Sequence, residues 1–551
     1  MSDPQPPKAP GRDRERDLAT LQQVHAAASA GRHEEAAHLA ARALDDGLEH
    51  PLLLNVLALR CERDGELLRA ERLLERAVEI APGDLGARNA LGLCLLRLDR
   101  PADALAHFDT LLVTHPQLPF LHASRGSALL AEGRIADAEA AFNRALELDP
   151  AQAVALAGLA GIASRRGAYA EARVRAERAL ERLPGLPDAV MSLASAELGE
   201  REPERALGRL HALIEDRRTG PLDRAYALGL LGDVLDSIDR RDAAFAAYTR
   251  CNELLRESFA RHYGDGEALR HVRWLSSQLE RSTAADWESV EPLGADPSGV
   301  RDHVFVLGFP RSGTTLLEIV LEGHPDVVSL EEQESLIDAV REYLREAQDL
   351  ERLRRADARA LEPLRASYWR RVAAAGAEVG GKVFVDKNPL NTLKLPLIAR
   401  LFPRAKILFA CRDPRDVVLS AFRHRFRMSA PIYELLTVEG AARYYDAVMH
   451  FGVLCTSRLP LQATLVRHED VVTEFAREMK RICAFIGIEW HEAMGDFALR
   501  TRERAALTPS TAQLVRGLNT EGLGHWRRYQ PQLAAALPIL DPWVRRFYYE
   551  P

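Results

Sequence analysis

The chain has 551 residues, which is long enough for two or more domains. Its 73 Lys and Arg residues stand against 80 Asp and Glu residues, and the resulting net charge of −7 argues against a general nucleic-acid-binding protein. No uncharged apolar run reaches the roughly 18 residues that a membrane-spanning helix requires, so we expect no membrane span.

The N-terminal segment and the cysteines both bear on the cellular compartment. Residues 1–15 are rich in proline and charge and lack the apolar core of a signal peptide, which predicts a disordered N-terminus. The six cysteines are widely spaced and form no C-x-x-C pair, a pattern typical of reduced, buried thiols rather than of disulfides or a zinc site. We therefore expect a cytoplasmic protein without a bound metal.

Residues 16–218 repeat with a period of 34. Three kinds of residue keep this period: prolines, glycines with one aspartate in the same frame, and alanines. They are Pro82, Pro116, Pro150 and Pro184; Gly31, Gly65, Asp99, Gly133 and Gly167; and Ala36, Ala70, Ala104, Ala138, Ala172 and Ala206. Because proline cannot continue a helix, glycine permits a tight turn and alanine permits close approach, each period predicts two helices joined by a turn.

A 34-residue helix–turn–helix unit resembles the tetratricopeptide repeat. A further pair near 221–256 has the same pattern but is out of frame by about four residues, so we expect the array to span 16–256. The resemblance implies an all-α superhelix whose concave face binds peptides or partner proteins. A substrate-recruiting groove and a purely structural stack or homodimerisation surface both remain open.

The second half of the chain has a different pattern. Residues 257–302 predict a helical linker, and strand–helix alternation begins at residue 303. Apolar segments predict strands at 304–308, 382–386, 405–411 and 463–469, with helices beginning near Gly313, Leu390, Pro414 and Val471. This alternation predicts an α/β domain with a mainly parallel sheet over residues 303–551.

The first predicted strand is followed by a glycine-rich turn, GFPRSGTT, at 308–315. Backbone N–H groups at the start of a helix form an anion site. The candidate phosphate-binding residues of this loop are Pro310, Arg311, Ser312, Gly313, Thr314 and Thr315. A Walker loop has lysine where this sequence has Thr314, and that lysine contacts the β- and γ-phosphates of a nucleotide. Its absence argues against hydrolysis of a triphosphate but not against binding of a shorter phosphate ester.

Two segments carry a second resemblance. PRSGTTLLEIVLEGHPDVVSLEEQ (310–333) and RDPRDVVLSAF (412–422) resemble the signature segments of sulfotransferases that use 3′-phosphoadenosine 5′-phosphosulfate (PAPS). The resemblance implies a P-loop-like fold in which residues 310–315 hold the 5′-phosphosulfate. It also implies that Arg412 and Ser420, eight residues apart, contact the 3′-phosphate, and that catalysis proceeds without a metal.

Within this family the sequence is similar to the tyrosylprotein sulfotransferase branch, on the segments HPDVVSLEE (324–332) and NTLK (391–394). This similarity implies that Glu332 is the general base, while Arg311 and Lys394 stabilise the sulfuryl group. It also implies an acceptor with a free hydroxyl, such as the tyrosine of a polypeptide held by the repeats.

The C-terminal segment PSTAQLVRGLNTEGLGHW (509–526) resembles a part of the same branch that contacts the cofactor. The resemblance places Ser510 near the phosphosulfate and His525 and Trp526 at the nucleotide. The sequence departs from the branch at His468, where the branch has tyrosine, and at His525, where it has lysine. We expect the fine contacts to the cofactor to differ at these two positions.

Other interpretations of the same residues stay open. Ser329 and Glu332 have the spacing of a capping box, so Glu332 is either a base or a helix cap. Lys387 either contacts the cofactor phosphate or pairs with Asp386. The chain as a whole is alternatively an inactive sulfotransferase-like scaffold, or a P-loop kinase with VFVD (383–386) as its Walker B strand. The acceptor class, whether tyrosine, sugar, lipid or small molecule, does not follow from the sequence.

Overall fold

The computed structural model describes residues 14–288, 293–294, 296–346, 348–503, 517–518, 520 and 522–550. The chain divides into two compact units. The first extends to Leu231 and leaves out residues 165–167, and the second takes these three residues and begins again at Gly232. Among the described residues no helix combines the length and the apolar character that crossing a membrane requires.

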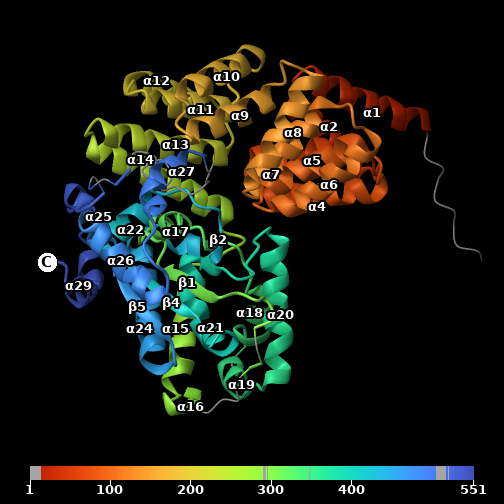
Figure 1. Ribbon diagram of the computed structural model, residues 1–551. Helices are drawn as coiled ribbons and strands as arrows, with labels where there is room; N and C mark the ends of the chain where they lie inside the picture. Colours follow the sequence, from red (N-terminus) through yellow and green to blue (C-terminus); the bar gives the residue numbers. More distant parts are fainter. Residues whose placement is uncertain are drawn as a thin grey trace, which may run out of the picture. The chain divides into compact units, whose positions relative to one another are not determined.

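The first unit consists of successive antiparallel helices (Figure 1). Their bounds are α1 Arg14–Ser29, α2 His33–Asp45, α3 Pro51–Arg63, α4 Leu67–Ile80, α5 Leu85–Arg97, α6 Pro101–Thr114, α7 Pro119–Ala131, α8 Ile135–Leu148, α9 Ala153–Arg165, α10 Tyr169–Arg182, α11 Pro187–Gly199, α12 Pro203–Glu215 and α13 Pro221–Ser237. Helices α4, α6, α8 and α10 each end two residues before one of the periodic prolines, as predicted.

The turns and the core of this unit also follow the predicted period. The turn residues Gly31, Gly65, Asp99, Gly133, Gly167 and Arg201 all have left-handed φ angles between 59° and 81°. All six periodic alanines are buried, as are Phe108 and Phe142. A Cβ on Gly92 would lie 2.6 Å from the ring of Phe108, so the helices approach closely enough that only glycine fits there.

The shift in the repeat frame lies within α13. This helix begins 34 residues after the start of α11, but it has 17 residues where α11 has 13. The next left-handed turn residue, Asp239, consequently falls four residues late. Gly232 lies against Tyr248 as Gly92 lies against Phe108, so the extra helical turn precedes Gly232.

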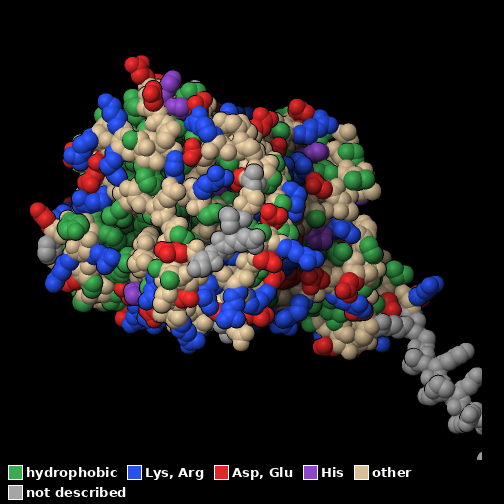
Figure 2. All heavy atoms as spheres, turned by 60° about the horizontal axis from the view of Figure 1, so that its bottom comes forward, with side chains coloured by type: hydrophobic (Ala, Val, Ile, Leu, Met, Phe, Trp, Pro, Cys, Tyr) green, Lys and Arg blue, Asp and Glu red, His purple; other side chains and the backbone are tan. Residues whose placement is uncertain are grey.

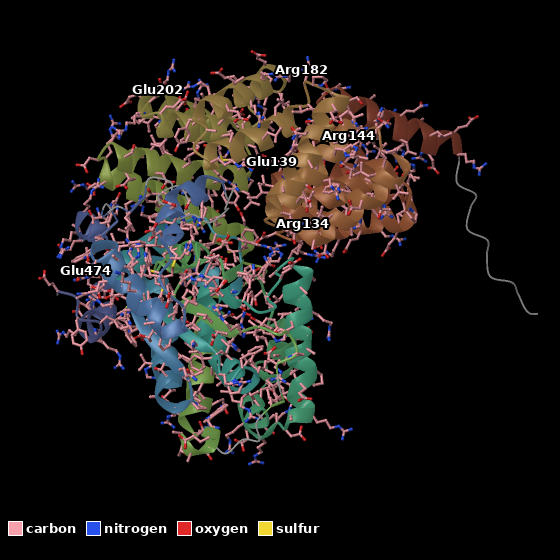
Figure 3. All side chains as sticks on the ribbon, in the orientation of Figure 1. Arg134, Glu139, Arg144, Arg182, Glu202 and Glu474 are labelled. Carbon is pink, nitrogen blue, oxygen red and sulfur yellow. The ribbon has the colours of Figure 1, made fainter. Side chains whose placement is uncertain are left out.

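Ion pairs on the repeats are mostly exposed and local. Arg134 and Arg144, labelled in Figure 3, pair with Asp137 and Glu147 at 2.8 and 2.7 Å. Exposed pairs of this kind contribute about 0–1 kcal/mol each, so the packing of the buried alanines and aromatic rings stabilises the array. On the face shown in Figure 2, Lys and Arg side chains are interspersed with Asp and Glu side chains.

The second unit contains a five-stranded sheet in which all neighbouring strands are parallel, in the order β2-β3-β1-β4-β5. The strands are β1 Asp302–Gly308, β2 Val327–Glu331, β3 Val383–Lys387, β4 Lys406–Cys411 and β5 Gln462–Arg467. The predicted α/β domain with a parallel sheet is therefore confirmed, and four strands lie within two residues of their predicted bounds. The edge strand β2 was not predicted.

Helices surround this sheet. They are α14 Arg241–Phe259, α15 Glu267–Glu280, α16 Ala285–Glu288, α17 Thr314–Leu321, α18 Ile337–Tyr343, α19 Asp349–Arg355, α20 Ala358–Ala374, η1 Pro389–Lys394, α21 Leu395–Leu401, α22 Pro414–Arg423, α23 Ala430–Glu434, α24 Val438–Arg458, α25 His468–Thr473, α26 Phe475–Ile486, η2 Glu492–Asp496, α27 Phe497–Glu503, η3 His525–Tyr529 and α29 Leu537–Arg546. The helices predicted at Gly313 and Pro414 are α17 and α22. A 3₁₀ turn, η1, precedes α21 where a helix was predicted from Leu390, and α25 begins at His468 rather than Val471.

The core of the second unit lies between the sheet and these helices. It includes the apolar side chains of β1, β3 and β4 and those of α17 and α26. The six cysteines are free and buried, as the sequence predicted. Because the carboxyl ends of parallel strands meet at one edge, the loops after β1, β3 and β4 converge there.

Candidate active site

The loop between β1 and α17 owes its shape to two glycines. Gly308 and Gly313 have φ angles of 154° and 94°. A Cβ on Gly308 would lie 2.3 Å from the carbonyl oxygen of Ala410, and one on Gly313 would lie 2.5 Å from Nδ1 of His468. Both positions therefore require glycine, and the backbone N–H groups at the start of α17 remain available to an anion.

The side chains of the loop face different partners. Pro310, Ser312, Thr314 and Thr315 are buried. The hydroxyl of Ser312 donates to the carbonyl oxygen of Phe309 at 2.6 Å, so it stabilises the loop from within. The predicted phosphate loop thus has the backbone of an anion site, with one of its hydroxyls bonded inside the loop.

Arg311 connects the loop to α22. Its backbone is left-handed, with φ 73°, and its Nε donates to Oγ of Ser420 at 2.9 Å. Burial and the positive charge of Arg412 lower the pKa of the Arg311 guanidinium to about 10, so it stays protonated at neutral pH. Arg311 and Ser420, 109 positions apart in the sequence, are therefore brought together by the fold.

Arg412 follows β4 and faces the C-terminal segment. One of its Nη atoms donates to the carbonyl oxygen of Gly522, and the same atom lies 4.0 Å from the carboxylate of Asp416. Its Nε is buried and meets no hydrogen-bond acceptor within the described part of the chain. A buried donor without an acceptor is costly, which suits a site whose acceptor is a bound anion.

The segment around Trp526 lies against α22. The carboxylate of Asp416 accepts hydrogen bonds from the backbone N–H groups of Gly524 and Trp526 at 2.7 and 2.8 Å. The guanidinium of Arg415 lies 4.0 Å from the centre of the Trp526 ring. His525 contacts Arg423, the last residue of α22. Ser510 lies outside the described residues.

His468 lies at the start of α25, against Gly313. Burial, together with the positive charges of Arg412 and Arg311, lowers the pKa of its imidazole to about 3. The ring is therefore neutral at physiological pH and adds no charge to the two arginines.

Glu332 does not cap a helix. Ser329 lies in β2, paired with β3, and its hydroxyl donates to Glu318 at 3.2 Å, while α18 begins only at Ile337. The capping-box interpretation is therefore wrong, because strand pairing takes residues 327–331 out of the helix. Glu332 itself has a left-handed φ of 47°, and its N–H donates to the carbonyl oxygen of Lys387 at 2.7 Å.

Lys387 is the buried centre of an ionic cluster that the sequence did not predict. Its Nζ lies 2.7 Å from Glu332, 3.2 Å from Glu331 and 3.4 Å from Glu318. Although burial opposes it, the charges of Glu318 and Glu332 raise the pKa of Lys387 above its usual value. The lysine thus holds the Glu332 carboxylate and connects it to α17, the helix that follows the loop.

Of the two alternatives for Lys387, pairing with Asp386 does not occur. Consecutive residues of a strand point to opposite faces of the sheet. Asp386 instead accepts hydrogen bonds from the hydroxyl of Tyr368 at 2.7 Å and from the amide of Asn391 at 3.1 Å. Burial raises the pKa of this carboxyl to about 6.

The NTLK segment forms η1 and lies beside the loop. Thr392 donates to the carbonyl oxygen of Gly308 at 2.7 Å. Lys394 pairs with Glu334 at 2.6 Å, so the structure does not place it in contact with Glu332. The sequence clue to Lys387 is its position at the end of β3, and the clue to this segment is its position just after β3. Both lie at the carboxyl edge, where ligands of parallel sheets bind. Within the described residues no group of three or more His, Cys, Asp and Glu side chains is arranged to hold a metal ion.

Lys387→Met should lower the free energy of unfolding of the second unit by about 3–5 kcal/mol, because it leaves Glu318 buried without its counter-charge. Lys394→Met is the matched control and should cost only about 0–1 kcal/mol, because the side chain of Glu334 is 57% exposed. All six tryptophans, Trp274, Trp287, Trp369, Trp490, Trp526 and Trp543, belong to the second unit, so urea unfolding followed by tryptophan fluorescence reports on it alone. Equal losses in the two variants would contradict this account of the cluster.

Comparison with known proteins supports both halves of the architecture. The sequence model of the Sulfotransferase family matches residues 303–492. Models of the tetratricopeptide repeat match residues 63–123 and, in a second version, residues 21–85 and 124–187.

Three relatives show how far the similarity extends. An uncharacterized protein of Aquifex aeolicus (strain VF5) is 26% identical over 368 residues, which cover 64% of this chain and 46% of that protein. Protein-tyrosine sulfotransferase A of Caenorhabditis elegans is 25% identical over 45% of this chain and 67% of its own length. Protein-tyrosine sulfotransferase 1 of Danio rerio is 24% identical over 45% of this chain and 72% of its own length. The chain thus spans about half the length of the first relative and about two thirds of the second. It combines tetratricopeptide repeats with a domain of the sulfotransferase family.

Proposed function

We propose that the second unit is a sulfotransferase that moves the sulfuryl group of PAPS to an acceptor hydroxyl. The observation that carries this proposal is the hydrogen bond from Arg311 to Ser420, because it joins the glycine-rich loop to α22. A glycine-rich loop and a helix that are joined in this way suit a nucleotide with phosphate groups on both its 5′ and 3′ positions. When bound, PAPS would supply an activated sulfuryl group with a phosphate as the leaving group.

The residues present fit such a donor. Loop residues 310–315 would hold the 5′-phosphosulfate through backbone N–H groups, and Arg412 with Ser420 would hold the 3′-phosphate. Two atoms support this assignment, Nε of Arg412 and the indole Nε1 of Trp526. Both are buried donors that meet no acceptor among the described residues. We also assign His468, Ser510 and His525 to the donor site, on the resemblance of their segments.

The chemistry requires a proton acceptor and cations. Glu332 would accept the proton of the acceptor hydroxyl as its oxygen bonds to sulfur and the bond from sulfur to the phosphate oxygen breaks. Lys387, 2.7 Å away, fixes the position of the Glu332 carboxylate. Arg311 and Lys394 would stabilise charge on the non-bridging oxygens.

For the acceptor we propose a polypeptide, with tyrosine as the first candidate. Relatives named as protein-tyrosine sulfotransferases and the presence of a repeat array support this choice. The repeats would then present the polypeptide to the second unit, a role that such arrays perform through their concave face.

A P-loop kinase fits the structure less well. Thr314 stands where the Walker lysine would be. Asp386, the Walker B candidate, is buried and already accepts hydrogen bonds from Tyr368 and Asn391.

Calorimetry with 3′-phosphoadenosine 5′-phosphate and with ATP and Mg²⁺ tests the donor class. We expect binding of the first nucleotide to be at least about tenfold tighter. Transfer of radiolabelled sulfate from PAPS to tyrosine peptides, glycans and small phenols then tests the activity. ATP turnover would favour the kinase, and tight binding of PAPS without transfer to any acceptor would favour the inactive scaffold.

A further inference from the structure

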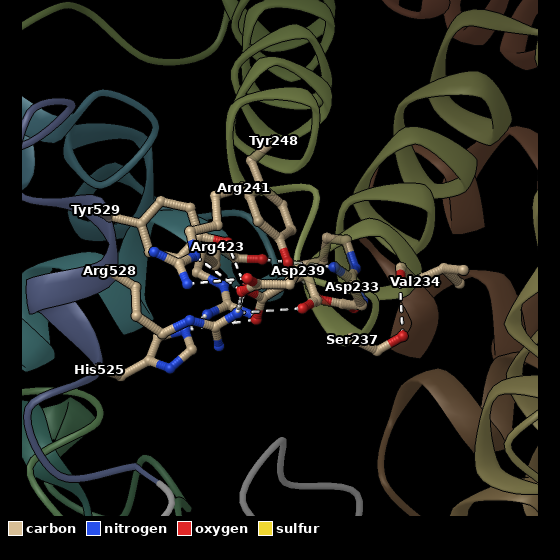
Figure 4. A network of polar contacts seen from close by, with 12 residues as sticks. Asp233, Val234, Ser237, Asp239, Arg241, Tyr248, Arg423, His525, Arg528 and Tyr529 are labelled. Carbon is tan, nitrogen blue, oxygen red and sulfur yellow. Dashed lines mark hydrogen bonds and ion pairs between the residues drawn. The ribbon is translucent and has the colours of Figure 1, made fainter.

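The last helical pair of the repeats carries a buried carboxylate, that of Asp236. Its four basic or hydroxyl partners, Arg423, His525, Arg528 and Tyr529, are labelled in Figure 4. Asp236, near the end of α13, lies 2.8 Å from Nη2 of Arg423 and 2.5 Å from the hydroxyl of Tyr529. His525 and Arg528 lie 3.4 and 3.5 Å away. Burial opposes ionisation, yet hydrogen bonds from His525 and Tyr529 and the charge of Arg423 hold the pKa of Asp236 below its usual value.

Two neighbouring aspartates extend this row. Asp233 pairs with Arg425 at 2.7 Å and accepts a hydrogen bond from the hydroxyl of Tyr248 at 2.9 Å. Asp239 pairs with Arg528 at 2.6 Å. All these residues belong to the second unit, which therefore includes the end of α13.

The repeat pattern sets Asp233 and Asp236 apart from the equivalent residues of α5, whereas Asp239 is a turn residue equivalent to Asp99. Gly92 and Gly232 occupy the same place in their repeats, each against an aromatic ring. The residue that follows Gly92 is Leu93, which is 39% exposed, whereas the residue that follows Gly232 is Asp233. The exposed position of Leu93 in α5 is thus taken by Asp233 in α13, after the four-residue shift in frame, and the partly buried position of Leu96 is taken by Asp236. Both aspartates bind arginines of the second unit.

Asp236 touches two segments that we assign to the donor site, the end of α22 and the segment of His525. Arg423 lies one helical turn after Ser420 on α22. His525 immediately precedes Trp526, whose N–H is bound by Asp416 of the same helix. Removing the Asp236 carboxylate would take a direct partner from Arg423 and His525 and reduce the compensation of the Arg423 charge, which acts on Arg311.

We propose that Asp236 is a positioning residue of the donor site, which shapes the 3′-phosphate subsite through Arg423 and His525. The last helical pair of the repeats is then an integral part of that site. This inference rests on the proposed function, because it presumes a donor nucleotide with a 3′-phosphate.

The test compares Asp236→Asn with the matched control Asp239→Asn. The side chain of Asp239 is 61% exposed, and its partner Arg528 keeps a contact to Asp236. Calorimetry on the full chain measures binding of 3′-phosphoadenosine 5′-phosphate and of adenosine 5′-phosphosulfate, which lacks the 3′-phosphate. We expect Asp236→Asn to weaken the first about tenfold and the second less than about twofold, while Asp239→Asn changes neither.

A second variant, His525→Gln, probes the same contact without leaving a buried charge unpaired. If Asp236 acts through His525, the double variant should lose less affinity for 3′-phosphoadenosine 5′-phosphate than the sum of the two single losses. Strict additivity would overturn the inference, as would equal weakening of both nucleotides, which marks a merely structural role. A wild-type chain that binds neither nucleotide would overturn the proposed function itself, which is a different result.

Discussion

Replacing Glu332 with glutamine should lower kcat for sulfuryl transfer by about 10²- to 10⁴-fold while leaving donor affinity nearly unchanged. Glutamine has the shape of glutamate but cannot accept the proton of the acceptor hydroxyl. It can still accept a hydrogen bond from Lys387, so the 2.7 Å contact has a substitute and the cluster keeps its other two carboxylates. The measurement is kcat with saturating PAPS, together with the dissociation constant for 3′-phosphoadenosine 5′-phosphate.

Glu331→Gln is the control for this variant. Glu331 is the adjacent residue and lies 3.2 Å from the same lysine, so its loss changes the charge of the cluster by the same amount. We expect it to lower kcat by less than about tenfold, because it is not the proton acceptor. If both variants lose activity equally, the charge of the cluster and not proton transfer by Glu332 explains the effect.

Replacing Arg311 with asparagine should lower kcat by about 10²- to 10³-fold, the effect typical of losing one donor to a developing negative charge. Asparagine tolerates the left-handed backbone, with φ 73° at this position, so the loop is expected to keep its shape. The loss should be large because the guanidinium is partly buried, and its charge acts more strongly on a nearby oxygen there than in bulk water.

Arg311→Lys separates charge from geometry. Lysine keeps the positive charge but cannot donate to Ser420 in the way that the Nε of Arg311 does, so we expect an intermediate loss of kcat. Retained activity in both variants would remove Arg311 from the reaction. Loss of donor binding alone, with normal kcat at saturation, would make it a binding residue.

The sequence determined the class of the fold and most of the candidate donor site. The 34-residue period of Pro, Gly and Ala predicted the repeat helices and their turns, because each of these residues constrains the backbone locally. Apolar runs predicted four of the five strands. The loop 308–315 and the pair Arg412 and Ser420 followed from motifs, and the Arg311–Ser420 bond shows that the fold brings these segments together.

The tertiary structure alone decided the surroundings of Glu332 and Lys387. The spacing of Ser329 and Glu332 also fitted a helix cap, but pairing of β2 with β3 makes this segment a strand. Register then places Glu332 beside Lys387. Local spacing cannot reveal such a result, because hydrogen bonding to a neighbouring strand outweighs a local propensity.

The same reason explains why the Asp236 row was not predicted. Asp236 and Arg423 are 187 positions apart. The four-residue shift of the repeat frame, which the sequence did show, does not indicate that Arg423 is the partner of Asp236. Periodicity reports which residues of a helix face inward, since it depends on backbone geometry within one element. Periodicity does not indicate which distant charged residue pairs with a buried carboxylate. This pairing depends on how separate elements pack and on which ion pair compensates the carboxylate for its lost hydration.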